Sequence, residues 1–113
     1  MNKKRVGIVG VGNVGATLAF TLATKDICSS ILLKDQRENI TQAMALDISQ
    51  ATNAANSKTV IYACLNDEEF NNCDVIVITA GIARKPGMSR DDLLLINAQI
   101  MTSVIKGIIP YNP

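Results

Sequence analysis

Six residues near the amino terminus have types and a spacing that suit an anion-binding turn. Gly10-Val11-Gly12-Asn13-Val14-Gly15 places three glycines in the pattern GxGxxG. The first glycine allows a sharp turn, the second lets backbone approach a pyrophosphate, and the third lets a helix pack closely on a strand. A helix that begins here directs unpaired N–H groups and the positive end of its dipole at the phosphates. Alone, the motif is also compatible with a turn that only packs a helix on a sheet.

The residues around this turn strengthen the interpretation. The apolar run Val6–Val9 precedes it, a helical pattern follows it, and Asp35 ends a second apolar run twenty positions after Gly15. A strand, a glycine turn, a helix, a second strand and a terminal acid form the arrangement of a dinucleotide-binding unit. The sequence therefore predicts such a unit at its amino-terminal end.

A second candidate site is the loop from Ala80 to Arg90. Its segment Arg84–Arg90 carries three cations in seven residues. A guanidinium is a rigid fork that matches a carboxylate with two parallel hydrogen bonds. Pro86 has a restricted backbone and the adjacent Gly87 a flexible one, a combination that suits a mobile lid. In isolation the segment could equally be a solvated basic turn.

Alternating strand and helix patterns must position these two segments. Such alternation predicts an α/β fold of the Rossmann type: a doubly wound parallel sheet in the order 3-2-1-4, truncated after about four strands, with helices on both faces. Ligands bind such sheets where the strand order reverses, between the first and fourth strands here. The glycine turn and the loop 80–90 should therefore be neighbours. The expected strands are 5–10, 30–35, 59–64 and 75–79, and the expected helices are 14–26, 38–51 and 91–106, with a short helical turn at 67–72.

Apolar residues at helical spacing predict which faces are buried. The β-branched strand 75–79 is expected to be buried on both faces. Asp47 and Asn97 fall on apolar helix stripes, so each requires a partner. For Asp47 a structural hydrogen bond or a subunit contact is favoured, whereas Asn97 could equally have a structural or a chemical role. The stripes are Val14, Leu18, Leu22 and Ala23; Ile40, Met44, Asp47 and Ala51; and Leu93, Ile96, Ile100, Val104 and Ile105.

Composition limits the partners and the class of protein. The 113 residues suffice for one domain with an aliphatic core, being 48% hydrophobic but only 4% aromatic. A net charge of +1 argues against nucleic acid or a membrane as the partner. The three cysteines, with no CxxC pattern and no histidine, indicate reduced structural thiols and no metal site. The basic residues Lys3–Arg5 precede an apolar run too short and glycine-rich for a signal peptide, which favours a cytoplasmic protein.

Several segments carry a specific family resemblance. Residues 80–97 (AGIARKPGMSRDDLLLIN) resemble the active-site loop and following helix of malate dehydrogenases, within the lactate/malate dehydrogenase family. The segments Gly10–Gly15, Ala45–Asp47 and Thr79–Gly81, together with Asp35, also resemble it. The resemblance spans essentially the whole chain.

The resemblance implies a cofactor and the residues that hold it. The segment Gly10–Gly15 (Gly10, Val11, Gly12, Asn13, Val14 and Gly15) would hold the pyrophosphate of NAD, and Asp35 the adenosine ribose hydroxyls. Asp35 would also repel a 2′-phosphate, which favours NAD over NADP. Ala80, Gly81 and Asn97 would contact the cofactor.

The resemblance also implies a substrate. Arg84 matches the residue that pairs with the distal carboxylate of malate or oxaloacetate, a position where lactate dehydrogenases typically carry glutamine. Arg90 matches the catalytic arginine that polarises the substrate carbonyl as hydride arrives. The helix with Asp47 resembles one at a dimer interface, which implies a homo-oligomer in the full-length form.

Part of the family pattern is absent from these residues. A family member would continue into further strands and a catalytic domain that supplies a histidine acid/base, its aspartate partner and a second substrate arginine. The sequence contains no histidine. We therefore expect residues 1–113 to be an incomplete NAD-binding domain that is inactive alone. The exposed edge of its fourth strand should cause self-association or poor solubility. Two alternatives are a fragment of a dehydrogenase for lactate or another 2-hydroxy acid, and a non-catalytic nucleotide-binding module.

Overall fold

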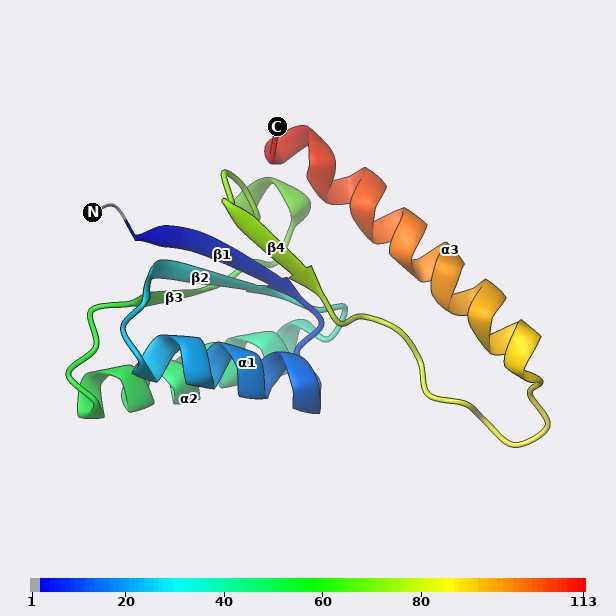
Figure 1. The fold of residues 1–113 in the computed structure, drawn as a ribbon, viewed down its shortest axis with the longest axis horizontal. Helices are drawn as coiled ribbons and strands as arrows, with labels where there is room; N and C mark the ends of the chain where they lie inside the picture. The colour runs from blue at the N-terminus through cyan, green and yellow to red at the C-terminus, as the bar shows by residue number, and fades with distance from the viewer. Residues whose placement is uncertain (1–2) are drawn as a thin grey trace.

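A four-stranded parallel sheet forms the centre of the molecule. The computed structural model describes residues 3–113. The strands lie in the order β3-β2-β1-β4 and every neighbouring pair is parallel, which confirms the predicted topology (Figure 1). The strands are β1 (Lys4–Val9), β2 (Cys28–Lys34), β3 (Val60–Ala63) and β4 (Val75–Ile78).

Helices cover both faces of this sheet, as expected for a doubly wound fold. Helices α1 (Asn13–Thr24) and α2 (Glu38–Ala54) lie on one face, and α3 (Arg90–Ile108) lies on the other (Figure 1). Two short 3-10 turns, η1 (Asp67–Glu69) and η2 (Ile109–Tyr111), lie near the carboxyl end of α3. The predicted elements are all present. The largest boundary differences are at the end of α2, which continues from Ala51 to Ala54, and at the helical turn predicted over 67–72, which ends at Glu69.

The buried residues form one cluster on each side of the sheet. Between the sheet and helices α1 and α2 lie Ile8, Ile31, Leu33, Ala19 and Ile48, each at most 1% exposed. The cluster on the opposite face contains Val9, Leu32, Cys64, Phe70 and Ile108. Alternate residues of β1 and β2 therefore feed different clusters, because successive side chains of a strand point to opposite faces. The two clusters hold the carboxyl ends of these strands in place.

The buried face of α1 differs from the predicted stripe. Gly15, Ala19 and Ala23 are buried at spacings of four residues, whereas Val14 is 71% exposed. The small residues let the helix axis approach the sheet, so the stripe is centred on them, and Leu22 packs only at its edge. Placing Val14 on the buried face was therefore wrong.

The buried face of α2 is also rotated from the prediction. Its buried residues are Thr41, Ala45, Ile48 and Thr52, and Asp47 is exposed. Asp47 consequently needs no buried partner. Two of the residues that face the sheet are threonines, and both hydroxyls donate to carbonyl groups of the preceding turn. A polar residue that satisfies its own hydrogen bond can occupy a buried stripe, and a pattern of apolar letters does not reveal this.

The strand β4 is less buried than its sequence indicates. It is the edge strand beyond β1, and Val75 is 49% exposed. The expectation of burial on both faces was therefore wrong for this structure. Only Ile108 of α3 is fully buried, although the predicted stripe from Leu93 to Ile105 is the less exposed side of that helix.

Residues 90–111 are long and apolar enough to cross a membrane by length and composition alone. The helix nevertheless has a polar start, since Ser89 and Asp92 form the predicted capping box. Near its carboxyl end, Val104 and Ile108 belong to the cluster on this face of the sheet, whereas Leu94 and Leu95 near its start are exposed. The carboxyl-terminal part of α3 therefore packs against the sheet.

Candidate functional site

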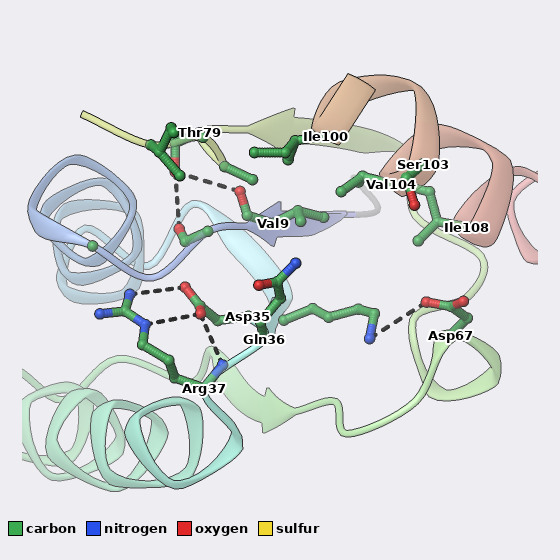
Figure 2. Close-up of a pocket in the computed structure, with 16 residues that line it drawn as sticks. Val9, Asp35, Gln36, Arg37, Asp67, Thr79, Ile100, Ser103, Val104 and Ile108 are labelled. Atoms are coloured by element: carbon green, nitrogen blue, oxygen red, sulfur yellow. Dashed lines mark hydrogen bonds and ion pairs between the residues drawn. The ribbon is translucent and has the colours of Figure 1, made fainter. Parts of the chain in front are cut away.

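The glycine turn joins β1 to α1 at the point where the strand order reverses. Gly10 has φ +100°, a conformation that side chains disfavour, and its N–H donates to the carbonyl of Lys34 at 2.8 Å. The Thr79 hydroxyl donates to the Gly10 carbonyl at 2.9 Å (Figure 2). The turn is thus tied to the ends of both neighbouring strands, β2 and β4.

The packing role predicted for Gly15 is confirmed, whereas the predicted role of Gly12 in binding a pyrophosphate stays a prediction. A Cβ on Gly15 would collide with the Gly10 carbonyl oxygen, so this glycine is required for close helix packing. Among residues 3–113, a Cβ on Gly12 would meet no atom beyond its chain neighbours within 4 Å, so packing between these residues does not require a glycine there. Gly12 precedes the first turn of α1, where no side chain caps the N–H groups of Asn13, Val14 and Gly15. These groups remain for an anionic ligand.

Asp35 ends the second strand as predicted, but its carboxylate is fully engaged within the chain. Oδ2 accepts from the Val11 N–H at 2.8 Å and from Nη2 of Arg37 at 3.0 Å. Oδ1 accepts from the backbone N–H and from Nε of Arg37, both at 3.0 Å. The Arg37 guanidinium is the main cause that holds the pKa of Asp35 far below its usual range, with the Val11 and Arg37 amides adding to it and burial opposing it.

This depressed pKa predicts a pH-dependent contribution to stability. Because the folded-state pKa of Asp35 lies below the unfolded value near ~4, the contribution is present above that pH and is lost as the pH falls below it. In urea unfolding, wild type should therefore be more stable than Asp35→Asn at pH 7, with a difference that shrinks below about pH 4. A difference in free energy of unfolding that stays constant from neutral to strongly acidic pH would contradict this prediction.

A cleft of about 470 Å³ connects the glycine turn to Asp35. Figure 2 shows its two walls, which are the ends of β1 and β2 and the inner side of α3. Polar groups lie at the strand ends, whereas α3 contributes an apolar wall that could accept a flat ring. The lining residues are Val9, Gly10, Gly12, Lys34, Asp35, Gln36, Arg37, Asp67, Thr79, Ala80, Gly81, Ile82, Ile100, Ser103, Val104 and Ile108.

These residues fit a dinucleotide. The uncapped N–H groups and the open backbone at Gly12 suit a diphosphate, and the acid at the end of β2 suits a ribose. Ala80 and Gly81 line the cleft as expected. NAD would supply the hydride acceptor here, and the chain would supply binding and orientation.

The two substrate-loop arginines lie away from this cleft. Residues 79–82 adjoin the glycine turn, but the rest of the loop extends away from the sheet before α3 begins (Figure 1). Arg84 and Arg90 are exposed, and neither lines the cleft. Nε of Arg84 donates to the Met88 carbonyl at 3.1 Å across the loop. We expected the whole loop 80–90 to neighbour the glycine turn. This was right for the first residues of the loop and wrong for its tip, which has few contacts with the rest of the molecule.

Asn97 has a structural partner. Its Oδ1 accepts from the Ile82 N–H at 2.9 Å, and its Nδ2 donates to the Ile82 carbonyl at 3.3 Å. The same oxygen would lie 3.1 Å from a Cβ on Gly81. Asn97 thus fastens the start of the loop to α3 beside the cleft. Its direct contact with a cofactor stays a prediction.

The cysteine thiols are free, and two of them, Cys28 and Cys64, are buried. Burial raises the pKa of Cys64 to about 11 and is also the main cause of the raised pKa values of Cys28 and Cys73. Such thiols are protonated at neutral pH and therefore unreactive. Within residues 3–113 no group of His, Cys, Asp or Glu side chains is arranged to hold a metal ion.

Several cleft residues were not identified as site residues from the sequence. Ile100 and Val104 belong to the stripe predicted as core, and Arg37 and Asp67 lie in polar segments without a motif. Lys34 and Asp67 form an ion pair at 3.3 Å that closes one end of the cleft (Figure 2). The only available signal for Arg37 was its position two residues after the predicted acid.

Comparison with known proteins identifies the family. The family model "lactate/malate dehydrogenase, NAD binding domain" matches residues 4–113. A malate dehydrogenase from Aliarcobacter butzleri is 66% identical over 113 residues, covering 100% of this chain and 36% of the relative. The chain thus spans about a third of the length of the curated relatives that it matches.

Solved structures agree with this assignment. The malate dehydrogenase of Picrophilus torridus has a TM-score of 0.90 at 39% identity, covering 96% of this chain and 35% of that chain. The Archaeoglobus fulgidus malate dehydrogenase, solved in complex with NADH, has a TM-score of 0.90 at 35% identity, with coverages of 96% and 37%. The match to the family model, the relatives and the fold lead to one conclusion: this chain belongs to the lactate/malate dehydrogenase family and corresponds to its NAD-binding domain.

Proposed function

We propose that this chain provides the NAD site of a malate dehydrogenase, which interconverts malate and oxaloacetate by hydride transfer. The observation that carries the proposal is the cleft at the strand-order reversal, which joins the uncapped turn Gly10–Gly15 to Asp35. In this proposal the first-turn N–H groups of α1 bind the pyrophosphate, and Ala80, Gly81 and Asn97 lie along the nicotinamide half. Asp35 binds the adenosine ribose.

Two exposed arginines support malate as the substrate. Arg84 would pair with the distal carboxylate of malate or oxaloacetate, and Arg90 would polarise the carbonyl that receives the hydride. Arg84 lies in the loop that extends away from the sheet and Arg90 is the first residue of α3, so this segment must fold over the cleft to bring them there. Pro86 and Gly87 at the loop tip are suited to such a lid motion.

The proton-transfer group of this reaction has to lie outside these 113 residues. They contain no histidine, and the two carboxylates that line the cleft are paired, Asp35 with Arg37 and Asp67 with Lys34. We therefore propose that the chain alone does not turn over malate, because loss of a general acid/base costs ~10²–10⁴ in rate.

Binding of NADH to the chain is the first test. Titration of the 113-residue chain by NADH fluorescence should give saturable binding, and Asp35→Ala should weaken it. Asp74→Ala, at the opposite end of the sheet, is the control. Absence of saturable binding to folded material would refute the proposed function.

The substrate is tested in a chimera that joins residues 1–113 to the remaining two thirds of the Aliarcobacter butzleri relative. Oxaloacetate should be reduced faster than pyruvate, and Arg84→Gln should shift the preference toward pyruvate. A preference for pyruvate in the unchanged chimera would favour a lactate dehydrogenase. NADH binding that oxaloacetate does not tighten would favour a non-catalytic nucleotide-binding module.

We also propose a cellular setting. The net charge of +1 gives no electrostatic reason for binding nucleic acid or an anionic membrane. Two buried free cysteines suit a reducing compartment, so we propose a cytoplasmic protein that acts in the tricarboxylic acid cycle. The exposed Asp47 on α2 supports the proposal of a homo-oligomer, because a surface position is available to a subunit contact.

A further inference from the structure

The charge at the ribose end of the cleft differs from what Asp35 alone implies. A single acid there would repel a 2′-phosphate. In the structure, Asp35 is paired with Arg37 at 3.0 Å, and Lys34 is paired with Asp67 at 3.3 Å (Figure 2). All four residues line the cleft. At the ribose end the Arg37 cation therefore balances the Asp35 anion, so this end of the site is neutral rather than acidic, and Lys34 likewise balances Asp67 elsewhere in the cleft.

The pairing also leaves the carboxylate without a spare acceptor site. A carboxylate has about four lone-pair positions. Val11 and Arg37 together direct four donors at the two oxygens of Asp35. A ribose hydroxyl can donate to Asp35 only when it displaces one of them. Arg37 is the donor that can move, because its side chain is 53% exposed, whereas Val11 is buried.

The same guanidinium has donors left for a phosphate. Its Nε and Nη2 atoms donate to Asp35, whereas Nη1 has no hydrogen-bond partner within residues 3–113. A guanidinium carries five N–H donors in a planar fork, so it can bind a carboxylate and a phosphate together. A 2′-phosphate at the ribose would lie beside Asp35 and hence beside this cation.

We propose that Arg37 is a specificity-determining residue that makes this site tolerant of NADP. It competes with the 2′-hydroxyl of NAD for Asp35 and provides a cation for the 2′-phosphate of NADP. Both effects make the affinities for NAD and NADP more similar than they would be if Asp35 were unpaired. This inference rests on the proposed NAD site and corrects one part of it: Asp35 by itself does not exclude the phosphorylated cofactor.

The test measures NADH and NADPH binding to the full 113-residue chain by fluorescence titration. For Arg37→Gln, the ratio of the NADPH to the NADH dissociation constant should rise roughly tenfold. This is the change in affinity expected when one charge-assisted hydrogen bond is lost in a partly exposed site. Lys25→Gln removes an equal charge from the end of α1, away from the cleft, and should leave the ratio unchanged. Arg37→Lys, which keeps the charge but not the fork, should give an intermediate ratio.

A variant of Asp35, the partner of Arg37, provides a second test of the same proposal. Asp35→Asn is isosteric and removes the anion, so Arg37 should favour NADPH and the ratio should fall below that of the wild type. Adding Arg37→Gln to Asp35→Asn should abolish that gain. Circular dichroism melting of each variant establishes that it is folded.

The outcomes separate this inference from the proposed function. Normal NADH binding with a ratio that Arg37→Gln leaves unchanged overturns the role of Arg37 alone. Equal weakening of both cofactors by Arg37→Gln also overturns it, because Arg37 would then only support the fold of the site. Loss of all binding in the wild type overturns the NAD site and this inference together.

Discussion

Gly12→Ala will leave the stability of the chain unchanged while weakening NADH binding by roughly a hundredfold, or ~2.7 kcal/mol. The physical reason is that packing within the chain does not require a glycine at position 12, whereas the approach of a diphosphate does. A Cβ at this position meets no atom beyond its chain neighbours within 4 Å in the described part of the chain, and the Gly12 φ of −82° is accessible to alanine. The same Cβ would occupy the space through which a diphosphate approaches the backbone.

Two measurements are needed for this prediction. Urea unfolding should give the same midpoint for Gly12→Ala and wild type, and fluorescence titration should give the difference in NADH affinity. Thr17→Ala, on the exposed side of α1, is the matched control and should alter neither strongly. If Gly12→Ala binds NADH as tightly as wild type, the diphosphate does not lie on this turn.

Gly15→Ala is expected to lower the free energy of unfolding by about 3 kcal/mol, at the upper end of the cost of overpacking. The added Cβ would collide with the Gly10 carbonyl oxygen and would lie 3.0 Å from the Thr79 hydroxyl. Gly10 cannot easily move, because its N–H is bonded to Lys34 and its carbonyl accepts from Thr79. The higher helix propensity of alanine, ~1 kcal/mol, offsets only part of this cost.

Chemical denaturation with urea measures the effect of Gly15→Ala directly. NADH binding should also weaken, but only in parallel with the loss of folded protein. An unfolding midpoint equal to that of wild type would show that α1 can shift away from β1 without cost. Gly12→Ala and Gly15→Ala thus form a pair in which one glycine serves the ligand and the other serves the packing.

Much of the fold could be predicted from the sequence because its signals are local. The β-branched and aliphatic runs before Gly10 and Asp35 favour strands, and Ser89 with Asp92 starts a helix through its own hydrogen bonds. The strand order followed because parallel strands joined by right-handed crossovers allow few arrangements. Helix faces were harder to predict, because Thr41 and Thr52 are buried with internally satisfied hydroxyls while Val14 is exposed.

The candidate site divides in the same way. The positions of Gly10, Gly12 and Asp35 followed from spacing along one βαβ unit, because the diphosphate turn and the ribose acid belong to consecutive elements. The apolar wall of Ile100 and Val104 could not be assigned to the cleft, since the same periodicity describes a helix that packs only on the sheet. The placement of Arg84 and Arg90 was also beyond prediction, because a loop with few contacts has no local signal for its direction.

The sequence by itself determined the alternation of elements, the glycine turn and the family to which the chain belongs, because these depend on residue type and short-range spacing. Only the tertiary structure decided what surrounds Asp35. Arg37 folds back onto its carboxylate, and Lys34 reaches Asp67 across the cleft. Arg37 is only two residues from Asp35, but the Val11 N–H that also binds this carboxylate, and the Lys34–Asp67 pair, join segments far apart along the chain. Those contacts depend on how the glycine turn, β2 and η1 meet in space, because electrostatic interactions depend on distance rather than on separation along the chain.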